Sequence, residues 1–188
     1  MTYKIILASQ SSRRKQLLSL LDIDFSVEVR SVPEVYPQSI ASQDVAEYIA
    51  KLKANAFNDI ENDKIVITAD TVVCIDGKVL GKPKNASNAK EMLRMLSNKS
   101  HKVITGVCIK TKQQEVSFSD TTTVYFKSLS DTEINYYISR YKPYDKAGSY
   151  GIQEWIGAIG IIKIVGSYYN VVGLPTEKLS TELSKIIY

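Results

Sequence analysis

Apolar and polar residues along this chain alternate in several segments with the period of two that is typical of β-strands. Counting continuous apolar runs as well as alternating ones, seven strand-like runs occur: Tyr3–Ala8, Phe25–Val29, Lys64–Ala69, Val72–Ile75, Lys102–Lys110, Val116–Phe126 and Gly160–Val165. The dipeptide Asp76-Gly77 follows the fourth run and predicts a hairpin turn. Helical patterns fill the segments between the strands. This order of elements predicts an α/β protein with a mixed sheet.

Apolar residues spaced three and four apart predict the helices. Their faces are formed by Val45, Ile49, Leu52 and Ala56, by Ala89, Met92, Leu93 and Leu96 within Ala86–Leu96, by Ile134, Tyr137, Ile138 and Tyr141, and by Leu179, Leu183 and Ile186 within Thr176–Tyr188. Ser130 and Glu133 have the spacing of a capping box before the third of these faces. The Met and Tyr residues at helical spacing are expected to belong to the core.

The segment Ile5–Leu18, IILASQSSRRKQLL, passes from an apolar strand through serines into a helical pattern. Free N–H groups and the positive dipole end of such a helix favour an anion. The adjacent Arg13 and Arg14 add fork-shaped donors that suit phosphate oxygens. A phosphorylated ligand is the first inference.

The composition is that of a soluble globular protein, with 44% hydrophobic and 23% charged residues among 188. No linker or repeat interrupts it, so we expect a single domain over residues 1–188. The net charge of +4 is spread along the chain, which favours a small anionic ligand over nucleic acid. The N-terminal residues contain neither a signal-peptide pattern nor a membrane span, so a cytoplasmic location without membrane association is expected. Cys74 and Cys108 are expected to be reduced structural thiols.

Several familiar chemistries are disfavoured by what the chain lacks. His101 is the only histidine, so histidine-based zinc catalysis and a Ser-His-Asp triad have little support, and we expect His101 to have a structural hydrogen-bonding role. The chain contains no GxxxxGK[ST] loop and no GxGxxG after a strand, which excludes the P-loop and Rossmann interpretations.

Asp70 is the strongest candidate for chemistry, because it ends the apolar run Ile65–Ala69. Ligands of open α/β sheets bind beyond strand ends, where a carboxylate can hold a hard cation or orient a water. An aspartate here can equally form a turn or cap a helix. Lys53, Lys82 and Glu34 have the same two interpretations, ligand contact or plain solvation, but with the arginines they make a phosphate-and-metal set.

Six ordered segments now form one set: LASQSSRRKQLL, ADTVV from Ala69, GKP from Gly81, HKVITGV from His101, DKAGSYGIQ from Asp145 and GSYYNVVGLP from Gly166. The set resembles the Maf family of nucleoside triphosphate pyrophosphatases over almost the whole chain. The resemblance implies an elongated mixed central sheet with flanking helices and two lobes around a cleft, similar to inosine triphosphate pyrophosphatases. A homodimer is also expected from it.

The resemblance further implies hydrolysis of a nucleoside triphosphate to the monophosphate and pyrophosphate with a divalent cation, magnesium, manganese or cobalt. Asp70 would activate the water or hold the metal, with Glu34 as a second metal-site carboxylate. The phosphates would be bound by Ser9, Arg13, Arg14, Lys53 and Lys82.

The segment KAGSYGIQ resembles the branch that acts on dTTP and UTP, with Arg13, Thr71 and Gln153 as specificity residues. Three positions depart from the usual family pattern: Ser12 replaces a proline and could cap the helix, Pro33 replaces a second acid, and Glu154 replaces a glycine. Two alternatives stay open. One is a nucleotide-binding regulator of septum formation without essential turnover, and the other is a pyrophosphatase that prefers 7-methyl-GTP.

Overall fold

The computed structural model describes residues 3–187, and the chain divides into two compact units. Unit 1 contains residues 1–71, 105–120 and 173–188, and unit 2 contains residues 72–104 and 121–172. The boundary falls inside three long strands, β3 (Lys64–Ile75), β5 (Ser100–Lys110) and β6 (Glu115–Phe126), so each unit includes part of each strand. The expectation of a single domain stays a prediction.

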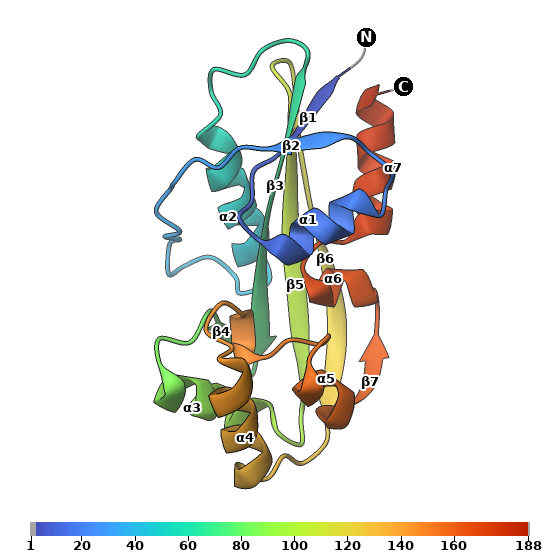
Figure 1. Cartoon of the computed structure of the whole chain (residues 1–188). Coiled ribbons are helices and arrows are strands. Elements are labelled where there is room, and N and C mark those ends of the chain that lie inside the picture. The colour runs from blue at the N-terminus through green and yellow to red at the C-terminus, as the bar shows by residue number, and fades with distance from the viewer. Residues whose placement is uncertain (1–2, 188) are drawn as a thin grey trace. The chain divides into compact units, whose positions relative to one another are not determined.

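The described residues form a seven-stranded sheet in the order β2-β1-β3-β5-β6-β7, with β4 paired to β3 (Figure 1). The four short strands are β1 (Lys4–Leu7), β2 (Phe25–Val27), β4 (Lys78–Leu80) and β7 (Ile161–Val165). β1 is parallel to both β2 and β3, whereas β3–β4 and β6–β7 are antiparallel. The prediction of an α/β protein with a mixed sheet is confirmed.

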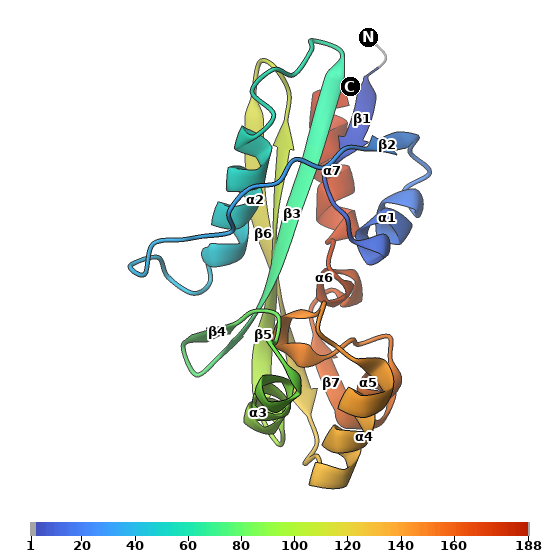
Figure 2. The ribbon, with the colours of Figure 1, turned by 60° about the vertical axis from the view of Figure 1, so that its left-hand side comes forward.

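In unit 1, helices cover both faces of the sheet. α2 (Val45–Asn55) lies on one face, and α1 (Ser12–Ser19) and α7 (Thr176–Ile187) lie on the other (Figure 2). The contact of α2 is close, because a Cβ added at Gly106 of β5 would come within 2.2 Å of the Glu47 nitrogen. Thr68 of β3 also donates its hydroxyl to the Ala50 carbonyl of α2 at 2.7 Å. α2 is therefore held directly against the strand that carries Asp70.

Unit 2 is built around the helices α3 (Ala86–Leu96) and α4 (Asp131–Tyr141), with the shorter α5 (Trp155–Gly160) and α6 (Tyr168–Val172) and a 3-10 turn at Ala147–Ser149. Leu93, Ile134 and Tyr137, each 0% exposed, lie in its core cluster. The capping box of Ser130 and Glu133 is present at the start of α4. The bounds predicted for α3 are confirmed, as is the core position of Met92 and Tyr137, whereas Tyr141 is 36% exposed at the end of α4 and its predicted core position is wrong.

The turn and strand predictions have different outcomes around β3. Asp76 and Gly77 have φ values of 49° and 75° and connect β3 to β4, so the predicted hairpin is confirmed. The predicted strands Lys64–Ala69 and Val72–Ile75 are wrong as separate elements, because they are one continuous strand. The predicted last helix is confirmed through Ile187, and Tyr188 lies outside the described residues.

Both cysteines are buried and neither is part of a disulfide, as predicted. Among residues 3–187 there is no helix whose length and apolar character would let it cross a membrane.

Candidate functional site

The site in unit 1 begins where β1 stops beside β3. β1 pairs with β3 as far as Leu7 opposite Ile67, and the Ala8 N–H still donates to the Ile67 carbonyl at 2.8 Å. β3 continues past this point to Ile75. The prediction that Asp70 follows a strand end is therefore wrong for β3. The strand that ends here is β1, and its carboxyl end leads into the serine-rich loop before α1.

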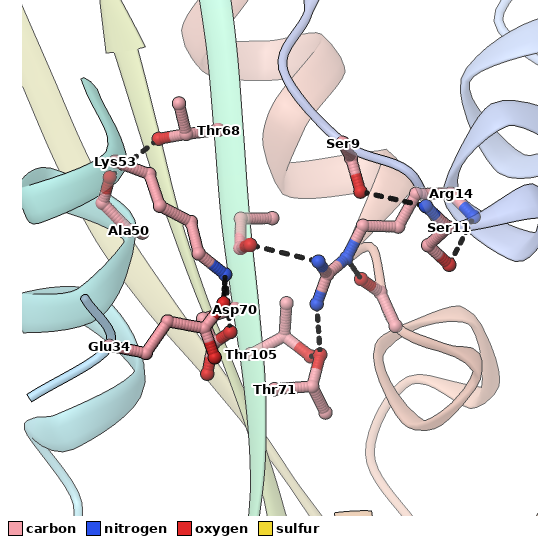
Figure 3. A network of polar contacts seen from close by, with 12 residues as sticks. Ser9, Ser11, Arg14, Glu34, Ala50, Lys53, Thr68, Asp70, Thr71 and Thr105 are labelled. Carbon is pink, nitrogen blue, oxygen red and sulfur yellow. Dashed lines mark hydrogen bonds and ion pairs between the residues drawn. The ribbon is translucent and has the colours of Figure 1, made fainter. Parts of the chain in front are cut away.

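Asp70 and Thr71 are neighbours in β3, and their side chains point to opposite faces of the strand (Figure 3). Asp70 shares the face of Thr68, which is covered by α2. Thr71 lies on the face of Arg14. The predicted residues of unit 1 thus form two clusters on either side of β3.

The cluster on the α2 face contains Lys53, Asp70 and Glu34. The Lys53 ammonium nitrogen lies 2.7 Å from Asp70 Oδ1 and 2.8 Å from Glu34 Oε1 (Figure 3). The side chains of Lys53 and Asp70 are only 16% and 15% exposed, whereas Glu34 is 46% exposed on the loop before α2. Partial burial strengthens such charged hydrogen bonds. The structure therefore brings into direct contact three residues that the sequence analysis placed in one phosphate-and-metal set.

This cluster suits a divalent cation in its donor chemistry. Two carboxylates already share one positive group, the Lys53 ammonium. Among the described residues, no group of three or more His, Cys, Asp or Glu side chains could hold a metal ion. Magnesium commonly uses one or two carboxylates and takes its other ligands from water and substrate phosphates. Glu34 and Asp70 fit that mode of binding, although Pro33 supplies no third acid.

The cluster on the other face is organised by Arg14, which donates three hydrogen bonds. Its Nε bonds the Gly173 carbonyl at 2.9 Å, one terminal nitrogen bonds the Ala69 carbonyl at 2.9 Å, and the other bonds Thr71 Oγ1 at 3.0 Å (Figure 3). Burial lowers the pKa of Arg14, and the charges of Asp70 and Glu34 act in the opposite direction. Three of the five guanidinium N–H groups are thus committed to the protein.

Thr105 and Gly173 belong to this second cluster, and no role was predicted for either. Thr71 Oγ1 lies 2.9 Å from Thr105 Oγ1 in addition to accepting from Arg14. Gly173 has a φ of 128°, a conformation that disfavours other residues, and its carbonyl accepts the Arg14 Nε–H. Both residues lie in segments that carried the family resemblance, HKVITGV and GSYYNVVGLP, which was the only signal for them.

The loop before α1 is tied together by serine side chains. Ser9 is buried, and its Oγ accepts the Ser11 N–H at 3.2 Å. Ser11 is the N-cap and accepts the Arg14 N–H at 3.4 Å, so the suggestion that Ser12 caps the helix is wrong. Ser12 is the first helical residue, a position where proline is also favoured. Arg13 follows it and is half-buried.

Lys82 and Gln153 belong to unit 2, and both are exposed. Their segments are joined by a hydrogen bond from the Gly148 N–H to the Gly81 carbonyl at 3.1 Å. His101 of unit 2 is buried, with its Nε2 2.7 Å from Tyr150 Oη and its ring stacked on Phe126. Burial lowers the pKa of His101 to about 4. Its predicted structural role is confirmed.

Comparison with known proteins assigns the family. The family model described as "Maf-like protein" matches residues 4–186. The chain belongs to the Maf family. A Maf relative from Phocaeicola vulgatus is 54% identical over 98% of this chain and 96% of its own length, and one from Parabacteroides distasonis is 56% identical over 96% and 95%. Both relatives are named dTTP/UTP pyrophosphatase.

The Maf fold is also similar to that of a solved HAM1 protein from Coxiella burnetii. That structure matches 98% of this chain and 100% of its own, with a TM-score of 0.54 and 16% sequence identity. At this identity the similarity concerns the fold alone. It agrees with the mixed α/β architecture described above.

Proposed function

We propose that this Maf-family protein hydrolyses dTTP and UTP between the α- and β-phosphates, releasing the nucleoside monophosphate and pyrophosphate. Two relatives that are 54% and 56% identical over nearly their full lengths are named dTTP/UTP pyrophosphatase. The observation that carries the proposal is the contact of Lys53 with both Asp70 and Glu34. In this cluster, Asp70 provides a base, Asp70 and Glu34 together provide a cation site, and the Lys53 ammonium provides a phosphate-binding group.

The reaction needs one water per turnover. A bond forms between the water oxygen and the α-phosphorus, the bond from that phosphorus to the bridging oxygen breaks, and pyrophosphate leaves. Asp70 Oδ1 is held by Lys53, so we assign the water to Oδ2, where the carboxylate orients it and accepts its proton. A divalent cation held by Asp70 and Glu34 would neutralise phosphate charge and lower the pKa of a bound water.

The remaining residues bind the substrate in this proposal. Lys53 and Arg13 supply positive charge to the triphosphate, and the Ser9 hydroxyl and the N-terminus of α1 supply hydrogen bonds. Arg14 retains two N–H groups for phosphate after its three internal bonds. For Lys82 as a phosphate-binding residue and Gln153 as a specificity residue, the support is the sequence motif in which each lies.

Thr71 is the third proposed specificity residue, beside Arg13 and Gln153. Its hydroxyl already contacts Arg14 and Thr105, so its influence on substrate choice would pass through the position of Arg14.

Pyrophosphate release from dTTP, UTP, CTP and 7-methyl-GTP, each with magnesium, manganese, cobalt or a chelator, tests the proposal. We expect turnover of dTTP and UTP, loss of turnover with the chelator, and a loss of about 10²-fold or more in Asp70→Asn and Lys53→Met. Asp131→Asn, a surface acid on α4, is the matched control and should retain the wild-type rate. If no triphosphate is cleaved faster than in buffer, or if Asp70→Asn is fully active, the proposal is wrong.

The same panel addresses the alternatives. A nucleotide-binding regulator would bind dTTP with no turnover, and its cellular effect would survive Asp70→Asn. A preference for 7-methyl-GTP would appear directly in the substrate ranking. The expected homodimer stays a prediction, which light scattering measures.

A further inference from the structure

Residues Gly151–Glu154 of unit 2 form a tight turn that presents Gln153. The Glu154 N–H donates to the Gly151 carbonyl at 3.0 Å, which places Ile152 and Gln153 at the two central positions of the turn. Gln153 is exposed, whereas Gly151 and Glu154 are half-buried. The ends of this turn therefore determine where the Gln153 amide lies.

One hydroxyl group fastens both ends of the turn. Tyr137 Oη accepts the Gly151 N–H at 3.0 Å and donates its own proton to Glu154 Oε2. Tyr137 lies on α4 and is 0% exposed, so its hydroxyl has a fixed position. Burial and the neighbouring Glu154 raise the pKa of Tyr137, which keeps the phenol protonated and able to donate.

Glu154 extends this connection to a second partner. Its other oxygen, Oε1, lies 2.9 Å from the Lys146 ammonium, and the Lys146 side chain is only 11% exposed. The space inside the turn is filled, because a Cβ added at Gly151 would lie 2.9 Å from Glu154 Cδ. A Cβ at Gly157 of α5 would come within 2.1 Å of the Ile152 carbonyl oxygen. The turn is thus enclosed by α4, α5 and the Lys146 side chain.

We propose that Tyr137 and Glu154 are positioning residues for Gln153, and that they set how sharply it distinguishes uracil and thymine from cytosine. This inference rests on the proposed function. Uracil and thymine present an O4 acceptor and an N3–H donor, whereas cytosine presents an N4 donor and an N3 acceptor. A glutamine amide reads this difference only when its oxygen and nitrogen are both correctly placed, and small displacements are costly in such a site.

The test compares Tyr137→Phe with Tyr136→Phe, which makes the same chemical change on the exposed neighbour in α4. We expect Tyr137→Phe to lower kcat/KM for UTP and dTTP about tenfold through KM, with CTP nearly unchanged, because one oriented hydrogen bond is of this order. Tyr136→Phe should retain the wild-type ranking. Glu154→Gln retains an acceptor for Tyr137 but removes the charge facing Lys146. Its kcat/KM for UTP and dTTP should therefore also decrease, but by less than in Tyr137→Phe.

A double-mutant cycle separates positioning from general damage. In a Gln153→Ala background, Tyr137→Phe should no longer change the UTP to CTP ratio. If Tyr137→Phe lowers kcat/KM equally for UTP, dTTP and CTP, or still changes the UTP to CTP ratio in the Gln153→Ala background, the inference is overturned. If Tyr137→Phe does not fold, the same cycle with Glu154→Gln gives the decision. A wild-type protein without turnover would instead overturn the proposed function.

Trp155 gives a second measurement that does not depend on activity. It is the only tryptophan, it directly follows Glu154, and its ring packs edge-on against Tyr136 at 4.8 Å. Loosening of the turn in Tyr137→Phe should increase quenching of Trp155 by acrylamide. Unchanged quenching would show that the hydroxyl does not hold the turn, and it would refute the positioning role.

Discussion

Replacement of Arg14 by lysine separates two roles for the second arginine of the SRR segment. Lysine keeps the positive charge but has a single nitrogen on a flexible stem. It cannot reach the Gly173 carbonyl, the Ala69 carbonyl and Thr71 Oγ1 together, so at least two of the three bonds are lost. Ala69 is 0% exposed in β3, and Gly173 is buried directly after α6.

The size of the effect follows from these bonds. A hydrogen bond to a charged group contributes about 1.5–3 kcal/mol, and the loss of two, reduced by entry of water into a partly buried site, lowers the free energy of unfolding by about 2–4 kcal/mol. In urea, with a slope of about 2 kcal/mol/M, this is a decrease of about 1–2 M in the midpoint. Circular dichroism during a urea titration measures this midpoint.

Arg94→Lys is the matched control, because Arg94 bonds Asp131 at the surface, at 3.0 and 2.6 Å. Its midpoint should stay that of the wild type, since exposed pairs contribute little. The reasoning is refuted if Arg14→Lys keeps the wild-type midpoint. A loss of turnover with that midpoint unchanged would make Arg14 a phosphate-binding residue alone.

Three further outcomes are expected. The folded pKa of His101, about 4, is below its ordinary value of 6.5, so the unfolded chain takes up the proton first as the pH falls. The free energy of unfolding should therefore decrease by about 3 kcal/mol as the pH is lowered from 6.5 to about 4. His101→Gln should flatten that part of the urea midpoint against pH, and an unchanged slope would contradict the assignment. Gly106→Ala forces a Cβ into the α2 backbone and should cost about 3 kcal/mol or more, seen as loss of soluble protein or a lower urea midpoint. Ser149→Ala removes a fully buried hydroxyl that has no hydrogen-bond partner among the described residues, and it should raise Tm by about 3 °C in calorimetry.

Local signals in the sequence were sufficient for most elements. The apolar face of Ala86–Leu96, the capping box of α4 and the Asp76-Gly77 turn each depend on residues a few positions apart, and the structure contains all three. β3 differed because Asp70 and Thr71 interrupt its apolar pattern. Polar residues are accommodated there because β1 has ended and each side chain finds a partner on its own face of the strand.

The partners within the site depended on contacts that are remote in sequence. Arg14 was predicted from its residue type as a phosphate donor, but two of its acceptors lie 55 and 159 positions away in the chain. Lys53 was predicted to belong to a phosphate-and-metal set with Glu34 and Asp70, but its direct contact with both carboxylates arises only when α2 is packed on β3. The contacts of Arg14 and of Lys53 both depend on side-chain direction and tertiary packing, which no single-sequence pattern contains.

The charges in unit 1 explain why the proposed reaction would need an added cation. Glu34 and Asp70 carry two negative charges, and the Lys53 ammonium that contacts both is already occupied by them. Arg14 adds a second positive charge, but three of its donors are bound to the protein. A triphosphate brings about four further negative charges, which repel the two carboxylates at short range. Lys53, Arg13 and Arg14 together leave part of this excess uncompensated, and a divalent cation held by Glu34 and Asp70 would reduce it further. Lys53 would then have charge to share with a phosphate oxygen, so cation binding and substrate binding in this cluster should each strengthen the other.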